Sequence, residues 1–173
     1  MPVGSVGARD EVTRVARDEV VQWLAGIVFG GVAITNSALQ AVTRGQELTF
    51  TQWRAILFVG EHEDGCRVGE VAARLQAALP ATSRLLRRLE RRELLTLTRD
   101  ERDRRATRAR LTDGGAALRS SVLAHREAEI AAIVDDVEPS AAADRTLRDL
   151  AARFDARGRQ TSAQLDPGGE KPT

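Results

Sequence analysis

The sequence predicts a mainly α-helical chain that carries one small β-hairpin. Of its 173 residues, 42% are hydrophobic and only 3% are aromatic, so Leu, Val, Ile and Ala must form most of the core, a composition that favours helices. Apolar residues recur three and four positions apart along most of the chain, which is the spacing of an amphipathic helix. The stretch 106–111 instead alternates between polar and apolar residues and predicts a strand.

The region 9–47 is expected to be helical. An apolar stripe with helical spacing runs along it and includes Trp23 and Ile27. The pair Gly30–Gly31 lies within this stripe, and a glycine costs roughly 1 kcal/mol in the middle of a helix. The pattern therefore fits either one long helix with a weak point at the two glycines or two helices.

Three short helices are predicted in the middle of the chain. The first opens near Thr49 or Thr51, either of which can cap a helix N-terminus. The second covers about 68–75, and a turn over 76–79 separates it from a third helix that starts at Pro80, a residue tolerated in a first helical turn. Two helices separated by about four residues have the spacing of a helix-turn-helix.

A hairpin is predicted directly after these helices. Its strands cover 94–98 and 106–111, and the turn between them, 100–105, is rich in arginine. A helix-turn-helix followed by such a hairpin is a winged helix-turn-helix, and we place it at 48–112.

The region 113–157 is expected to contain two more helices, separated at Pro139. The apolar stripe of the first includes Ile133 and Val137. The remaining residues, 158–173, are rich in Gly, Pro, Gln and charge, and we expect them to be disordered.

The composition also excludes several classes of protein. The single cysteine, Cys66, excludes a secreted scaffold held by intrachain disulfides. The N-terminus is charged and lacks the apolar core of a signal peptide. The apolar stretch from Val20 to Val42 is interrupted by five polar residues, which we interpret as too polar for a membrane span. We therefore expect a cytoplasmic protein with no membrane partner.

Positive charge is concentrated in one segment. The whole chain has a net charge of only +1, but 80–110 contains eleven arginines and five acidic residues, a net charge of +6. The rest of the chain has fifteen basic and twenty acidic residues. A basic segment in an otherwise acidic protein is typical of a surface that binds nucleic acid.

The third of the short helices and the hairpin supply side chains suited to double-stranded DNA. One helix fits the major groove, and residues near its N-terminus reach base edges, whereas residues further along face phosphates. An arginine at the hairpin tip can enter the adjacent minor groove. The candidate DNA-binding residues are Pro80, Ser83, Arg84, Arg87, Arg88, Arg91, Arg102, Asp103, Arg104 and Arg105.

Three segments resemble the MarR family of winged helix-turn-helix regulators, from about Leu48 to Gly115: GEVAARL, ATSRLLRRLERRELL and LTRDERDRRATRARLTDGG. The resemblance implies that Arg105 is the wing arginine of the minor groove and that Asp103 orients it. It also implies a homodimer and an effector pocket near the second helix of the chain, where Trp53 is a candidate lining residue.

The sequence departs from the family pattern at three positions. Ala78 stands where a capping serine is usual, and Thr82 stands at an inward position that is usually aliphatic. Glu93 replaces a glycine that commonly follows the recognition helix, which costs stability if the backbone there is left-handed.

Other chemically active residues do not form a convincing site. Cys66 next to Arg67 is a candidate redox sensor, but family members that sense oxidants usually carry their cysteine near the first helix, so we interpret it as incidental. His62 and His125 are too far apart to predict a metal site. We expect no cofactor, no metal and no enzymatic activity.

We therefore expect a ligand-responsive repressor that binds a palindromic operator as a homodimer. A dimer is expected because the apolar stripes of 9–47 and 113–157 are too long for a small winged helix to cover. Two alternatives remain: a non-specific architectural DNA-binding protein, and a winged helix used as a protein-interaction module.

Overall fold

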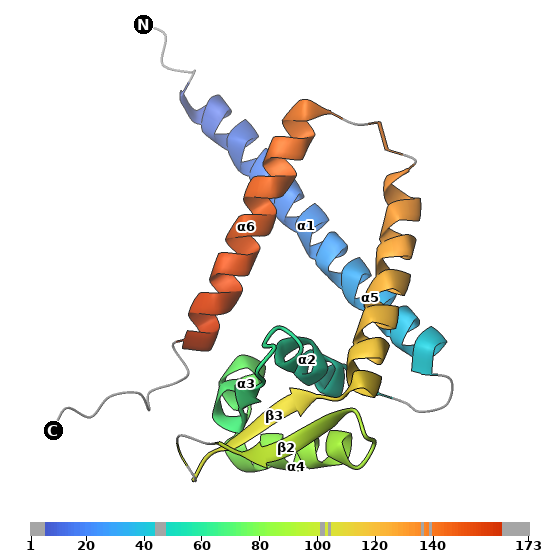
Figure 1. The fold of residues 1–173 in the computed structure, drawn as a ribbon. Helices are drawn as coiled ribbons and strands as arrows, with labels where there is room; N and C mark the ends of the chain where they lie inside the picture. Colours follow the sequence, from blue (N-terminus) through green and yellow to red (C-terminus); the bar gives the residue numbers. More distant parts are fainter. Residues whose placement is uncertain are drawn as a thin grey trace, which may run out of the picture.

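A computed structural model describes residues 6–43, 48–100, 103, 105–135, 137–138 and 140–163, with side chains described between 17 and 158. Three long helices stand above a smaller lobe of short helices and a sheet (Figure 1). In chain order the elements are α1 (Val6–Thr43), α2 (Phe50–Val59), β1 (Cys66–Arg67), α3 (Val68–Leu75), α4 (Leu79–Glu90), β2 (Leu95–Arg99), β3 (Thr107–Leu111), α5 (Asp113–Val134) and α6 (Ala141–Ala163). The predicted fold class, helical with a small hairpin wing, is confirmed.

The N-terminal region forms one continuous helix, α1, with no break at Gly30–Gly31. The C-terminal part of α1 packs against α5, where Ala38 and Leu39 are buried. The hydroxyl of Ser37 donates to Glu129 Oε1 at 3.3 Å across this contact. Packing against α5 therefore holds the end of a helix whose middle the two glycines weaken.

The lower lobe is the winged helix, and the start of its first helix is fixed by a local capping interaction. Thr49 caps α2: its hydroxyl accepts from Gln52 N at 3.2 Å, and the Gln52 side chain accepts from Thr49 N at 2.9 Å. The core beneath α2, α3 and α4 consists mainly of small and branched aliphatic residues. Its fully buried larger side chains are Trp53, Ile56, Val59, Val71, Leu86, Leu89, Leu95 and Val122.

The sheet has three strands in the order β1-β3-β2, not two. Cys66 pairs with Ala109 and Arg67 with Arg108, all antiparallel. The sequence pattern predicted the two strands of the hairpin but not β1. Two residues are too few to show an alternating pattern, and only the pairing with β3 makes them a strand.

Glu93 adopts a left-handed conformation, with φ of 57°. It lies in the turn that joins α4 to β2, where the sequence pattern indicated that a glycine is usual. A side chain in this region of backbone space costs about 1–2 kcal/mol, so Glu93 is a strained position.

The sixth helix is longer than expected, since α6 ends at Ala163. The prediction of disorder from residue 158 is therefore wrong for 158–163, while 164–173 lie outside the described residues. Large apolar side chains on α1, α5 and α6, and at Val137 just after α5, remain exposed in the single chain. They include Trp23, Ile27, Phe29, Ile133, Val137, Leu147 and Phe154.

One described segment, Arg17–Thr43, is long and apolar enough to cross a membrane by length and composition, and its most apolar 18-residue window has a mean hydropathy of 1.4. The sequence interpretation that the stretch from Val20 to Val42 is too polar does not hold by this criterion, because the residues that interrupt it are uncharged. The criterion is weak evidence for a membrane, since a helix that packs within a soluble protein also meets it.

Candidate nucleic-acid interface

The helix α4 has the two faces that the sequence predicted. Thr82, Leu86 and Leu89 are buried against the lobe, and the Thr82 hydroxyl donates to the Ala78 carbonyl at 3.3 Å. Ala78 is the N-cap residue and makes no side-chain hydrogen bond to the helix. Pro80 occupies the first turn, as expected.

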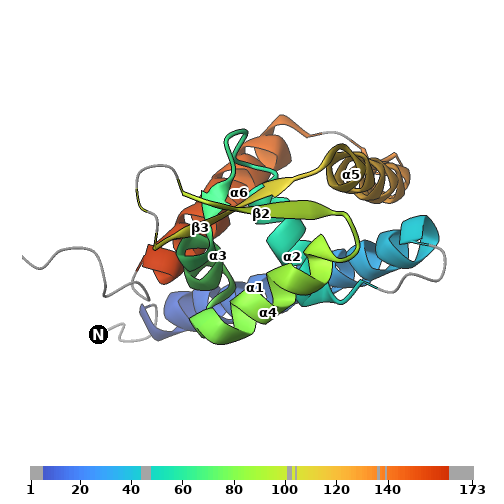
Figure 2. The same ribbon diagram turned by 60° about the horizontal axis from the view of Figure 1, so that its bottom comes forward.

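The opposite face of α4 is basic and open to solvent. Arg84, Arg87, Arg88 and Arg91 are exposed, and Ser83 is half-buried. Figure 2 shows α4 on the face of the lobe that carries the hairpin β2–β3, with no other helix in front of it. The predicted DNA-facing residues of α4 therefore share one accessible surface with the wing.

The wing places two of its four predicted residues within the described structure. The Asp103 carboxylate accepts from the backbone N–H of Arg105 at 3.0 Å, and the Asp103 N–H donates to Asp100 Oδ1 at 3.0 Å. Asp103 thus orients the backbone at Arg105. Arg102 and Arg104 lie outside the described residues.

Asp100 is the residue at the wing that sequence reasoning missed. Its side chain is 3% exposed, and its Oδ2 accepts from Arg67 Nε and from Arg108 Nη1, both at 3.1 Å. The Arg108 guanidinium also donates to the Gly65 carbonyl at 2.6 Å. The hydrogen bond and the charge of Asp100 raise the pKa of Arg67. Asp100 therefore joins the base of the wing to β1 and to β3.

Replacing Asp100 by asparagine is expected to destabilise the winged helix by about 1–3 kcal/mol. The amide keeps the shape but removes the charge from a buried position that faces two guanidinium groups. The lower half of the range is favoured because Arg67 and Arg108 are 43% and 34% exposed. Urea unfolding followed by circular dichroism measures the change.

The matched control is Asp144→Asn, which removes a solvent-exposed pair with Arg148 on α6. Surface pairs contribute about 0–1 kcal/mol, so this variant should unfold close to the wild type. Equal midpoints for the Asp100 and Asp144 variants would contradict a structural role for Asp100.

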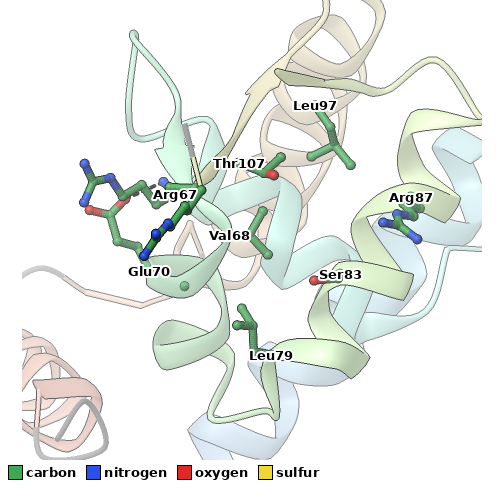
Figure 3. A pocket seen from close by; sticks show the side chains of 11 residues that line it. Arg67, Val68, Glu70, Leu79, Ser83, Arg87, Leu97 and Thr107 are labelled. Carbon is green, nitrogen blue, oxygen red and sulfur yellow. Dashed lines mark hydrogen bonds between the residues drawn. The ribbon is translucent and has the colours of Figure 1, made fainter. Parts of the chain in front are cut away.

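A cavity of about 590 Å³ lies between α4, α3 and the wing. Figure 3 shows Leu79 and Ser83 on α4 facing Val68 and Leu97 across it. Arg67, Arg87 and Arg105 also line it. The acidic Glu70 lines the cavity too, so three basic groups and one acidic group surround a partly apolar lining.

Trp53, the candidate effector-pocket residue, is 1% exposed within the core and is not among the lining residues of this cavity. Its indole Nε1 has no hydrogen-bond partner among the described residues. His62 donates from Nδ1 to the Phe58 carbonyl at 2.9 Å, and His125 lies 3.1 Å from Glu129. No cluster of three metal-ligating side chains occurs within the described part of the chain.

Cys66 is 1% exposed. Burial, followed by the charge of Glu70, raises the pKa of its thiol from 9.0 to about 12, although Arg108 acts in the opposite direction. The thiol is therefore protonated at neutral pH, which disfavours the nucleophilic thiolate that a redox sensor needs. The neighbouring Arg67 does not overcome this effect.

The Cys66 thiol is expected to resist Ellman's reagent in the folded protein at pH 8 and to react fully in urea. Because its folded pKa lies above the ordinary value, its contribution to stability is fully present below pH 9 and is lost as the pH rises towards 12. The chain has no tyrosine and one lysine, so few other groups titrate there. Cys66→Ala should show a flatter stability profile above pH 9, and rapid labelling of the folded wild type would contradict the assignment.

The fold and the site together define a winged helix-turn-helix protein with a basic recognition helix and wing. Residues 46–106 match the model of the MarR family. The resemblance stated from the sequence is thereby confirmed: the winged helix of this chain is similar to that of the MarR family, whose members are transcription regulators. None of the curated proteins matches the chain significantly.

Solved structures with the same fold cover most of the chain. RV1404 from Mycobacterium tuberculosis is 26% identical, with 91% of this chain and 97% of that chain aligned at a TM-score of 0.63. FabT from Streptococcus pneumoniae, solved in complex with DNA, is 20% identical over 81% and 98%, with a TM-score of 0.67. CouR from Rhodococcus jostii RHA1, bound to p-coumaroyl-CoA, is 20% identical over 82% and 93%, with a TM-score of 0.65.

Proposed function

We propose that the protein is a cytoplasmic repressor, without enzymatic activity, that binds a palindromic operator as a homodimer. The observation that carries the proposal is the row of exposed arginines on α4 beside the wing, on one open face of the lobe (Figure 2). A helix in the major groove and a wing in the neighbouring minor groove would use this face. FabT, which has the same fold, was solved in complex with DNA, and this supports the proposal that the present chain binds DNA.

The dimer is proposed from the apolar side chains that α1, α5 and α6 leave exposed. Two-fold symmetry would place two recognition helices about one DNA turn apart, and the operator would then be palindromic. Repression would follow where such a site overlaps a promoter.

A small-molecule effector is the final part of the proposal. CouR, a protein of the same fold, binds p-coumaroyl-CoA. A ligand that binds more tightly to the conformation unable to engage DNA would release the operator. Trp53, which is buried in the core on α2, remains the candidate residue for such a site.

The recognition helix and the wing are expected to fail in different ways. Arg84→Ala should cost about 1–3 kcal/mol on the operator and relax the sequence preference at one symmetric pair of positions, because Arg84 reads a base edge. Arg105→Ala should lose affinity mainly with A·T-rich flanks, because a narrow minor groove concentrates negative potential. Gel shifts on the operator and on variants of its half-site and flank measure both changes.

Asp103→Ala should reproduce a weaker form of the Arg105→Ala defect, since its carboxylate holds the backbone at Arg105. Arg91→Ala serves as the control, because the loss of a phosphate contact should weaken binding to all sequences alike. If Arg84→Ala and Arg105→Ala also weaken every sequence equally, the specific-regulator proposal fails in favour of an architectural DNA-binding protein. If the wild type binds no DNA, the result favours the alternative of a winged helix used as a protein-interaction module.

A further inference from the structure

A large apolar side chain stands exposed at the first turn of the recognition helix. Leu79 is the first residue of α4 and its side chain is 53% exposed. Within the described part of the winged helix, the other large apolar side chain that is exposed is Phe50, at 38%. Isolated exposed leucines are common on protein surfaces, so the position of Leu79, and not its exposure alone, carries the argument.

Leu79 shares one face of α4 with two polar residues that face the cavity. Leu79, Ser83 and Arg87 are spaced four residues apart, and all three line the cavity between α4 and the wing. Side chains at such spacing lie one above the other on a helix. Figure 3 shows Leu79 at the start of α4, with Ser83 above it on the same helix. The face thus presents a methyl-rich end, then a hydroxyl, then a guanidinium.

The first turn of a recognition helix is the part that reaches base edges in the major groove. The one apolar group that a base presents there is the C5-methyl of thymine. A leucine at that end finds no hydrogen-bond partner on a base edge, but its methyl groups can bury the thymine methyl and exclude water from both.

We propose that Leu79 is a specificity-determining residue that reads a thymine in each half-site through the C5-methyl group. The inference rests on the proposed function, because it requires α4 to occupy the major groove. Ser83 and Arg87, on the same face, would contact the neighbouring base edge or phosphate. Leu79 therefore adds an apolar contact to a surface that is otherwise polar and basic.

The test uses the full chain and an operator selected by the wild-type protein from a random duplex library. Each thymine of one half-site is replaced in turn by deoxyuracil, which removes only the methyl group. Affinities are measured for the wild type, Leu79→Ala and Leu79→Gln, with circular dichroism as the check of folding. Phe50→Ala is the matched control, because Phe50 is also exposed at the first position of its helix but lies on α2.

At one thymine, deoxyuracil should weaken wild-type binding about fourfold, the loss expected when one buried methyl group is removed. The same replacement should leave both Leu79 variants nearly unchanged, whereas Phe50→Ala should keep the wild-type response. Such coupling is specific to contact, since a variant that only weakened the fold would still respond to the methyl group.

If the wild type selects an operator but no thymine methyl loses its effect in the Leu79 variants, the inference is overturned and the proposed function stands. If the wild type selects no sequence from the library, the proposed function itself is wrong. A Leu79→Ala defect of equal size on every duplex would also overturn the inference, because it indicates a contact that reads no base.

Discussion

Replacing both Ile133 and Val137 by aspartate is expected to convert a homodimer into monomers. In the single chain these side chains are 59% and 61% exposed, and Trp23 and Phe29 on α1 reach 63% and 78%. Soluble monomers rarely expose contiguous apolar patches of more than a few hundred Å². A second copy of the chain is the partner that would bury them, and two buried carboxylates in each subunit would oppose that association.

Light scattering at micromolar concentration should give twice the 18.8 kDa chain mass for the wild type and the single-chain mass for the double variant. Operator affinity should fall when dimerisation is lost, because each half-site is then bound by a single subunit. Ser120→Asp with Ser121→Asp is the control, since it adds the same charge at exposed positions of α5 near the winged helix. A wild type that is monomeric, or a monomeric variant with undiminished affinity, would remove the basis for a palindromic operator.

Gly115→Ala is expected to destabilise the protein by about 3 kcal/mol or more. A Cβ at this position would penetrate the backbone carbonyl of Leu94, which no side-chain rotation can move away. The same turn carries two further bonds: the Thr112 hydroxyl donates to the Glu93 carbonyl at 2.6 Å and accepts from Gly115 N at 3.0 Å. The start of α5 therefore sits directly on the turn that precedes β2.

Gly114→Ala is the matched control for this prediction. The nearest atoms to its added Cβ lie 3.7 Å away, which is ordinary contact, so the urea midpoint should change little. The comparison separates helix propensity, which alanine improves at both positions, from the close approach at Gly115. Similar midpoints for the two variants would show that the N-terminus of α5 can move away from Leu94.

This close approach also bears on regulation. The helix α5 runs from the winged helix towards exposed apolar side chains such as Ile133 (Figure 1). In the proposed homodimer, its first turn would therefore set how α4 and the wing are held relative to a partner subunit. A proposed effector that changes the spacing of two recognition helices would act through this junction. Gly115 and Asp100 hold the hairpin in place from its two opposite ends, and the hairpin lies beside α4.

The sequence by itself determined the features that depend on neighbours along the chain. Helical periodicity placed Thr82 inward and the arginines of α4 outward, because residues three and four apart share a helix face whatever the surrounding fold. A cap at Thr49 or Thr51 and the energetic cost at Glu93 were predictable for the same reason, since both depend on local backbone geometry, and the structure places the cap at Thr49. The family motif that includes Gly115 was recognisable in the sequence, but the sequence did not show why a glycine is needed there.

Only the tertiary structure decided the features that join distant segments. β1 exists because Cys66 and Arg67 pair with β3, about forty residues further on. Asp100 joins the wing to β1 and β3 because the fold brings two distant arginines to its carboxylate. Arg67 lies 33 residues before it and Arg108 eight residues after it. Burial likewise decided that the Cys66 thiol stays protonated although an arginine is its neighbour in sequence. Strand pairing, ion pairing and desolvation all depend on distance in space, and the spacing of residues along the chain does not encode that distance.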